Sequence, residues 1–202
     1  SDNIRNDHGL IGATEALSAI HFPKDLGQLE KAQKRLRFEE LFFIQLQLLQ
    51  KKLEHRKQFK GHLFDKVGDF FNSFYNNHLP FSLTDAQKRV IKEIRSDFGS
   101  VAQMNRLLQG DVGSGKTIVA FLSALIALDN QMQATIVAPT EILAQQHYQT
   151  LSQLAAPLGL TIKLLTGATK AAERKEIHNQ LQSGELQLLV GTHAVLEPNV
   201  HF

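Results

Sequence analysis

The stretch from Gly110 to Thr117 reads Gly-Asp-Val-Gly-Ser-Gly-Lys-Thr, which fits the phosphate-binding loop pattern G-x-x-x-x-G-K-[ST]. Glycines let the backbone turn tightly and point N–H groups at an anion, and a helix that starts near Gly115 adds its positive N-terminal end. In this pattern Lys116 reaches the outer phosphates of a nucleotide and the Thr117 hydroxyl is a ligand for Mg²⁺. The sequence therefore predicts that ATP and Mg²⁺ bind at Gly110, Asp111, Val112, Gly113, Ser114, Gly115, Lys116 and Thr117, with Lys116 as the catalytic candidate.

The chain after Pro80 alternates between helical and strand patterns. Helices are expected over 84–98, 116–129, 141–155 and 170–181, and strands over 104–109, 134–138, 160–165 and 186–190. Such alternation implies right-handed crossovers and a parallel sheet. We therefore expect an α/β fold in which a P-loop NTPase (RecA-like) parallel sheet carries flanking helices.

The region before Pro80 is helical in pattern. Apolar residues recur at helical spacing over 28–57, and phenylalanines lie on one face of a second expected helix over 62–75. These patterns divide the chain into 1–27, a linker or the tail of a preceding domain, 28–79, a helical linker region, and 80–202, an α/β region that carries the phosphate-binding loop.

Composition excludes several classes of protein. The 202 residues contain no Cys, which rules out disulfides and thiolate metal sites. No apolar run approaches the ~18 residues that a membrane span needs. The formal charge of +2 does not reveal a nucleic-acid partner. A basic stretch over 51–60 favours a solvated helix end, and a phosphate contact is the alternative.

Three further segments follow expected strand ends: Pro139-Thr140, Thr166-Gly167 and Gly191-Thr192-His193. The carboxyl ends of parallel strands lie at one edge of the sheet, where ligands bind. Small and hydroxyl-bearing residues in series at that edge suit the close approach of a phosphate backbone, although Gly and Thr also end strands for reasons of turn geometry.

These residues resemble the first motor domain of a superfamily-2 helicase, specifically one of the RecG type. The resemblance is carried by four stretches after residue 79 and by a fifth upstream: 80–87 (PFSLTDAQ), 109–117 (QGDVGSGKT), 138–147 (APTEILAQQH), 191–194 (GTHA) and 35–41 (RLRFEEL). It implies that 80–202 are the N-terminal part of the ATP-binding motor domain 1, an incomplete motor domain, of an ATP-dependent DNA helicase. Such a helicase unwinds or remodels branched double-stranded DNA in repair and recombination. It also implies a monomer in the cytoplasm of a bacterial-type cell, associated with the nucleoid.

The resemblance implies that Phe81, Thr84 and Gln87 recognise adenine. A carboxamide can pair with the N6/N7 edge of adenine. Thr84-x-x-Gln87 is also a capping box, and Phe81 packed under the following helix is the alternative to Phe81 stacked on the base.

On the DNA side the resemblance implies contacts from Thr140, Gln145, Gly167, Thr192 and His193. Each has a simpler alternative. Thr140 also suits a helix N-cap, Gln145 an exposed helix position, and His193 a contact with neighbouring motor segments.

Hydrolysis by this class needs carboxylates at a strand end after the phosphate loop. The strand over 186–190 ends in Gly191, and the D-E-x-H segment of RecG-like helicases is expected beyond Phe202. We therefore expect weak nucleotide binding without turnover, and an unpaired sheet edge through which the chain self-associates.

Two other classes remain open on the residues alone. A small P-loop kinase would need an arginine-rich lid, for which Arg174-Lys175 is thin support. A non-catalytic module would dock a partner through the helix over 28–57 and the phenylalanine-rich helix after it.

Overall fold

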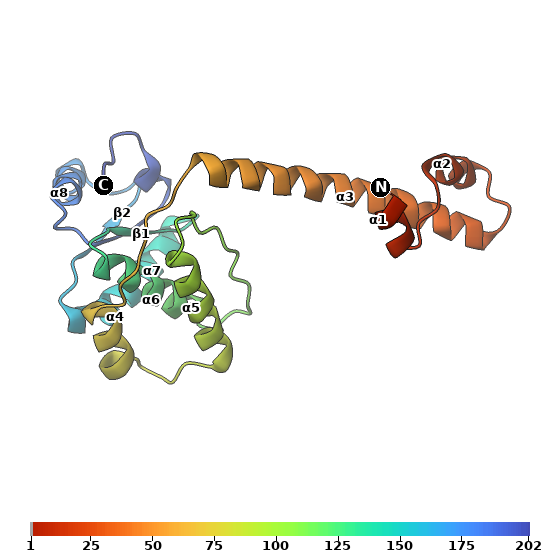
Figure 1. The fold of residues 1–202 in the computed structure, drawn as a ribbon. Coiled ribbons are helices and arrows are strands. Elements are labelled where there is room, and N and C mark those ends of the chain that lie inside the picture. The colour runs from red at the N-terminus through yellow and green to blue at the C-terminus, as the bar shows by residue number, and fades with distance from the viewer. Residues whose placement is uncertain (1) are drawn as a thin grey trace. The chain divides into compact units, whose positions relative to one another are not determined.

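The computed structural model describes residues 2–202, apart from the side chains of Arg56 and Lys57. The chain divides into two compact units, Ser1–Phe59 and Lys60–Phe202, and each is described by itself. Figure 1 shows the first unit in red to orange and the second in yellow to blue. Within the described residues, no helix is both long and apolar enough to cross a membrane.

The first unit consists of three helices, α1 (Asp2–Asp7), α2 (Ala13–His21) and α3 (Leu26–Gln58). α2 packs against α3 through buried Ala16, Ala19 and Ala32, whose small side chains allow close approach. Asp25 starts α3, because its carboxylate accepts a hydrogen bond from the Gln28 N–H at 2.7 Å. The helix predicted over 28–57 is therefore present, and the first 27 residues contain two further helices.

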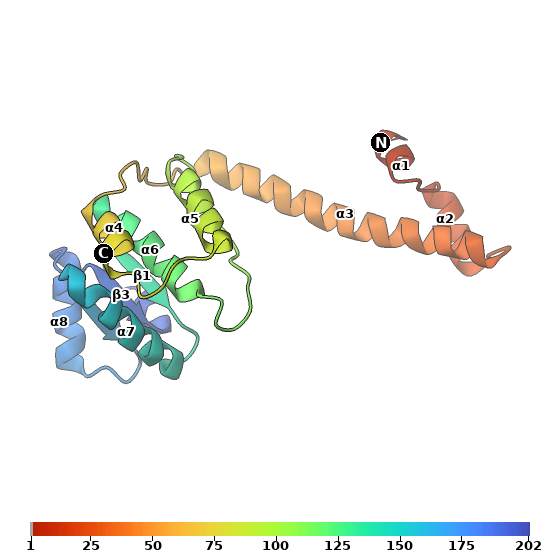
Figure 2. The same cartoon turned by 90° about the horizontal axis from the view of Figure 1, so that it is seen from below.

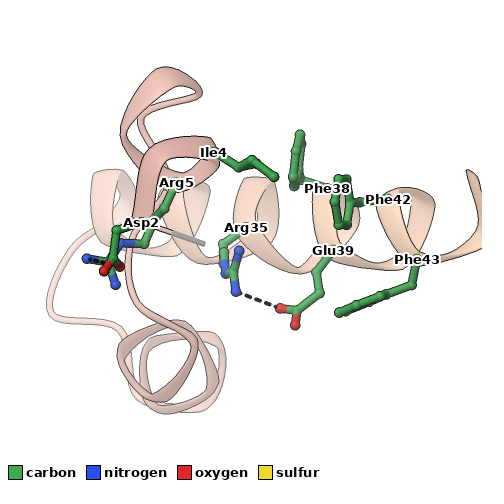
Figure 3. A pocket seen from close by; sticks show the side chains of 8 residues that line it. All are labelled: Asp2, Ile4, Arg5, Arg35, Phe38, Glu39, Phe42 and Phe43. Carbon is green, nitrogen blue, oxygen red and sulfur yellow. Dashed lines mark ion pairs between the residues drawn. The ribbon is translucent and has the colours of Figure 1, made fainter. Parts of the chain in front are cut away.

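A small pocket lies between α1 and the first half of α3 (Figure 3). Arg35 pairs with Glu39 one turn later at 3.1 Å, and the rings of Phe38 and Phe42 stack with centroids 5.7 Å apart. These residues belong to or follow the RecG-like stretch over 35–41, which is thus helical. Of the basic stretch over 51–60, Lys51 and Lys52 are exposed on α3, whereas the side chains of Arg56 and Lys57 lie outside the described part.

The second unit is built on a parallel sheet of three short strands. The strands are β1 (Ala134–Val137), β2 (Ile162–Leu165) and β3 (Leu188–Gly191), in the order β1-β3-β2. Ala134 and Ile162 both pair with Leu188, so the three strands start in register. β3 is buried throughout because it lies between the other two. The α/β class predicted from the alternating pattern is confirmed.

Helices cover both faces of this sheet (Figures 1 and 2). The helices are α5 (Asp85–Phe98), α6 (Lys116–Asp129), α7 (Glu141–Ala155) and α8 (Ala171–Gln182). Leu188 and Val190 share one core cluster with residues of α5, α6 and α7, whereas Leu189 shares another with Ile177 and Leu181 of α8. Because side chains alternate along a strand, α6 and α7 lie over one face of β3 and α8 lies over the other.

The predicted helix over 62–75 forms only in part. The structure has α4 (Asp69–Ser73), followed by a π-helical turn (Phe74–His78), and residues 62–68 are not helical. Gly61 is held against the backbone of 102–103, where an added Cβ would lie 2.9 Å from the Gln103 nitrogen. Phe74 is buried edge-on against Phe121 of α6, with ring centroids 4.9 Å apart. Contacts with residues distant in the sequence, rather than helical periodicity, therefore determine the conformation of this segment.

Residues 104–109, which the sequence predicts as a strand, do not form one in the structure. A strand needs a neighbour for its backbone groups, and among the described residues β1 has a partner on one side only, β3. The segment approaches the sheet with Leu108 partly buried in the core and Leu107 91% exposed. β1 and β2 are the two edge strands of the sheet.

Candidate functional site

The phosphate-binding loop joins the segment after α5 to the start of α6. Gly115 precedes the first residue of α6 and adopts a left-handed conformation with φ of +77°, as does Gly113 with φ of +81°. A side chain would be strained at both positions. The first N–H groups of a helix have no partner within it, so the turn directs the N-terminus of α6 into the loop.

Lys116 is the first residue of α6, and its side chain folds back onto the loop that precedes the helix. Its ammonium group donates hydrogen bonds to the main-chain oxygens of Gly110 at 2.8 Å and Asp111 at 2.7 Å. Thr117 follows in the first turn of α6 and is half-buried. The loop thus encloses a cation beside a helix N-terminus, and these residues fit a bound polyphosphate.

Gln87 uses both ends of its carboxamide inside the protein. Its oxygen accepts from the Thr84 N–H at 2.9 Å, and the Thr84 hydroxyl accepts from the Gln87 N–H at 3.2 Å, which completes the capping box. Its side-chain nitrogen donates to the main-chain oxygen of Ser114 at 2.9 Å. The cap is therefore present, and the bond to the loop is a contact that the sequence did not indicate, because 27 positions separate the two residues.

Phe81 lies just before this cap and is 50% exposed. Only part of its ring is covered by the protein, and the remainder is open to a stacking partner. Leu83, two residues later, is buried and takes the core position at the start of α5. Phe81 therefore stands just before the turn in which Gln87 links the Thr84 cap to Ser114 of the loop.

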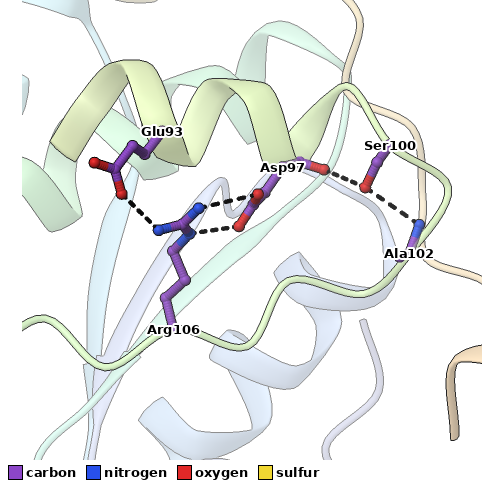
Figure 4. Close-up of polar contacts among 5 residues, drawn as sticks. All are labelled: Glu93, Asp97, Ser100, Ala102 and Arg106. Atoms are coloured by element: carbon purple, nitrogen blue, oxygen red, sulfur yellow. Dashed lines mark hydrogen bonds and ion pairs between the residues drawn. The ribbon is translucent and has the colours of Figure 1, made fainter. Parts of the chain in front are cut away.

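Arg106 joins the other end of α5 to the segment that leads into the loop (Figure 4). Nε bonds to Asp97 and Nη2 donates to the same carboxylate at 3.1 Å, while Nη1 donates to Glu93 at 2.7 Å. The hydrogen bond to Asp97, and then the charges of Asp97 and Glu93, raise the pKa of Arg106 above its ordinary value. Sequence reasoning missed this residue, because no local pattern joins it to α5.

Thr140 and Glu141 connect two of the strand-end segments. The Thr140 hydroxyl accepts from the Leu143 N–H at 3.3 Å and caps α7, as the simpler interpretation of this residue predicts. The carboxylate of Glu141 accepts from the N–H of Ala168 at 3.1 Å, and Ala168 directly follows Gly167. The segments after β1 and β2 are therefore in contact, and Gln145 is exposed further along α7.

The segment after β3 packs closely against β2. A Cβ on Gly191 would lie 2.1 Å from the Leu165 oxygen, so glycine is required there for lack of space. The Thr192 N–H donates to the same oxygen at 3.2 Å, and Thr192 is only 8% exposed. His193 is exposed at the start of a short 3-10 helix (His193–Leu196). Of the five DNA candidates, Thr140, Gln145, Gly167 and His193 are thus accessible and Thr192 is buried.

Arg174 of α8 binds residues that follow β2 and β3 at this edge of the sheet. It donates to the main-chain oxygen of Thr166 at 3.0 Å and pairs with Glu197 at 2.8 Å. The sequence drew attention to Arg174 only as possible support for a kinase lid. Its observed contacts are with the strand-end segments.

The described residues contain no group of three or more His, Cys, Asp or Glu side chains that could hold a metal ion.

Comparisons with known proteins agree with this arrangement. The family model of the DEAD/DEAH box helicases matches residues 84–201. The ATP-dependent DNA helicase RecG of Synechocystis sp. is 47% identical over 199 residues, which is 98% of this chain and 24% of that protein. RecG of Thermotoga maritima is 40% identical, over 100% of this chain and 26% of that protein.

A solved structure of RecG bound to a three-way DNA junction superposes with a TM-score of 0.86 and 40% identity, covering 100% of this chain and 27% of that one. The chain thus spans about a quarter of the length of the relatives that it matches. Together with the phosphate-binding loop and the parallel sheet, these likenesses show that the chain belongs to the DEAD/DEAH box helicase family and is a homologue of the ATP-dependent DNA helicase RecG.

Proposed function

We propose that this chain is the ATP-binding part of a DNA helicase that unwinds or remodels branched double-stranded DNA in repair and recombination. The observation that carries the proposal is the phosphate-binding loop, in which the Lys116 ammonium lies 2.8 Å from the Gly110 oxygen at the N-terminus of α6. Membership of a helicase family supports the use of ATP. The RecG homologue bound to a three-way junction supports branched DNA as the partner.

In this proposal Lys116 and the amides of Gly113, Ser114 and Gly115 bind the phosphates, and the Thr117 hydroxyl is a ligand of Mg²⁺. The Mg²⁺ ion would neutralise charge on the phosphates. Phe81, Thr84 and Gln87 form the side that faces adenine. Because both ends of the Gln87 carboxamide are engaged, pairing with adenine requires at least one of its present bonds to open.

DNA is proposed to lie along the strand-end edge, where Thr140, Gln145, Gly167 and His193 are accessible. Thr192 would position the accessible His193 beside it, since its side chain is buried and its N–H donates to the Leu165 oxygen. We assign the motor part to 80–202 and the helical linker to 28–79. The part of that linker from Lys60 onward is included in the compact second unit. The site of action is bacterial chromosomal DNA in the cytoplasm.

We further propose that the chain binds nucleotide without hydrolysing it. The three described strands are followed by Ala138, Thr166 and Thr192, so none of them presents a carboxylate at its C-terminal end. A base for the attacking water is needed at such a position. The open edge of β1 is the proposed surface for self-association of the chain, whereas the longer helicase would act as a monomer.

The test is binding of a fluorescent ATP analogue with Mg²⁺ to the chain, with and without forked DNA, beside a Lys116→Ala variant. We expect binding that depends on Lys116, increases with forked DNA and is not accompanied by phosphate release. Binding that is indifferent to Lys116→Ala would refute the assignment of the loop. Phosphate release abolished by the same substitution would refute the proposal that the chain is inactive.

A further inference from the structure

Helix α5 is attached to the phosphate-binding segment at both of its ends. At its first turn, the side-chain nitrogen of Gln87 donates to the Ser114 oxygen of the loop at 2.9 Å. At its last turns, Glu93 and Asp97 accept hydrogen bonds from Arg106, four residues before Gly110. Two contacts therefore connect α5 to the stretch from 106 to 114: one hydrogen bond near the start of the helix and one ion-pair network near its end.

The segment between α5 and the loop depends on side chains for its placement. No strand is assigned over 103–115 in the described structure. The Ser100 hydroxyl donates to the main-chain oxygen of Asp97 at 2.7 Å and accepts from the Ala102 N–H at 3.4 Å, which orders the turn after α5 (Figure 4). Met104 and Leu108 pack partly into the core. Arg106, between them, supplies the charged attachment to α5.

Arginine is the residue type that can bind both carboxylates of this ion-pair network at once. Glu93 and Asp97 are four residues apart on one helix and lie on the same face, where like charges repel each other. The planar guanidinium group donates to both carboxylates at once, as Figure 4 shows. A lysine in its place would keep the charge and lose the fork. Without any cation, α5 would retain an unfavourable acidic pair at its C-terminal end.

We propose that Arg106 is a positioning residue for the base of the bound nucleotide. Through α5 it sets where Phe81, Thr84 and Gln87 stand relative to the loop that binds the phosphates. The inference rests on the proposed function, because it takes the N-terminal turn of α5 as the side that recognises adenine. It predicts an effect on base recognition and none on phosphate binding alone.

The test compares two ligands of the chain, a fluorescent ATP analogue with Mg²⁺ and tripolyphosphate with Mg²⁺, which has phosphates and no base. In an Arg106→Gln variant we expect affinity for the ATP analogue to fall about fivefold, near the upper limit for a surface ion-pair network. Tripolyphosphate affinity should not change, and GTP should compete with the analogue better than it does in the unaltered chain. Arg106→Lys should lie between the two.

The matched control is Lys163→Gln. It removes a cation of the same unit that lies on β2 and pairs with Glu176 of α8 at 3.2 Å, with no bond to α5 or to the loop among those described. This variant should bind both ligands as the unaltered chain does. If Arg106→Gln does not fold, as judged by its thermal melt, Glu93→Gln removes one arm of the network and leaves the Asp97 fork in place, with the same direction of effect expected.

Equal losses for both ligands, no loss for either, or the same loss in Lys163→Gln would overturn the positioning role. Hydrogen–deuterium exchange without nucleotide gives a readout that needs no binding. Arg106→Gln should speed exchange at 84–87 and leave exchange at 110–115 as it is, whereas unchanged exchange at 84–87 overturns the inference. Binding that persists in Lys116→Ala contradicts the proposed function instead, so the two failures are distinguishable.

Discussion

The side-chain nitrogen of Gln87 donates a hydrogen bond to the main-chain oxygen of Ser114 at 2.9 Å, while its oxygen accepts from the N–H of Thr84 at 2.9 Å. One carboxamide thus caps a helix and holds the phosphate-binding loop. An added Cβ on Gly115 would lie 2.3 Å from the same nitrogen, so the close approach also requires glycine in the loop. The start of α5 and the loop are thereby fixed together.

Gln87→Glu separates the two roles of this side chain. A carboxylate still accepts from Thr84, so the cap persists, but it cannot donate to Ser114 and would lie beside the main-chain oxygen of that residue. We expect ATP-analogue affinity to fall while the melting temperature changes little, because capping is worth ~1 kcal/mol and is retained. Binding measured beside thermal melts checks this. Unchanged affinity would mean that the bond to Ser114 has no part in nucleotide binding.

Gly191→Ala should destabilise the sheet. The added methyl group would lie 2.1 Å from the Leu165 oxygen and 2.5 Å from a Val195 methyl carbon, and backbone atoms of two paired strands cannot move apart cheaply. We expect a loss of about 3 kcal/mol in the free energy of unfolding, the upper range for overpacking. Gly99→Ala is the control, since its nearest contact is an ordinary 3.6 Å. Denaturant titrations that give equal stability for the two variants would contradict the steric argument.

Asp129→Ala should release α4 from the end of α6. The Asp129 carboxylate accepts from the N–H groups of Gly68 at 2.9 Å, Phe70 at 2.9 Å and Phe71 at 3.1 Å. Losing this cap should cost about 2 kcal/mol, because three N–H groups lose their acceptor at once. Asp65→Ala makes the same charge change at an exposed position. Chemical unfolding of both variants measures the difference, and equal midpoints would show that α4 holds without this carboxylate.

Thr140→Asp separates the helix cap from the proposed DNA contact. Aspartate is as good an N-cap as threonine or better, so α7 should keep its stability within about 0.5 kcal/mol. The added negative charge would repel a DNA phosphate, and affinity for forked DNA should fall. Gln149→Glu adds the same charge at an exposed position of the same helix and should have less effect. Fluorescence anisotropy with labelled DNA measures both, and equal losses would point to general charge repulsion.

Several elements could be predicted from the sequence because their determinants are local. α6 begins at Lys116 and ends at Asp129 as its apolar run indicates, and α7 begins after the Thr140 cap. The cap at Thr84 was also visible in four consecutive residues. Caps, periodicity and the loop motif act over a few residues, so a single sequence carries them.

Other features could not be predicted because they join distant residues. The helix expected over 62–75 is shortened where Gly68 meets Asp129, 61 positions away. The strand expected over 104–109 is not assigned, because a strand depends on its neighbours as much as on its own residues. Arg106 has no local pattern that would point to Glu93.

The sequence by itself determined the phosphate-binding loop, the alternating α/β order and the helicase family, since each is written in residue types at short spacing. Only the tertiary structure decided how Gln87 and Arg106 attach α5 to that loop, and which strand-end residues stay accessible. Thr192 is buried and His193 next to it is exposed. The physical reason is that side-chain contacts between elements depend on packing, which no local pattern specifies.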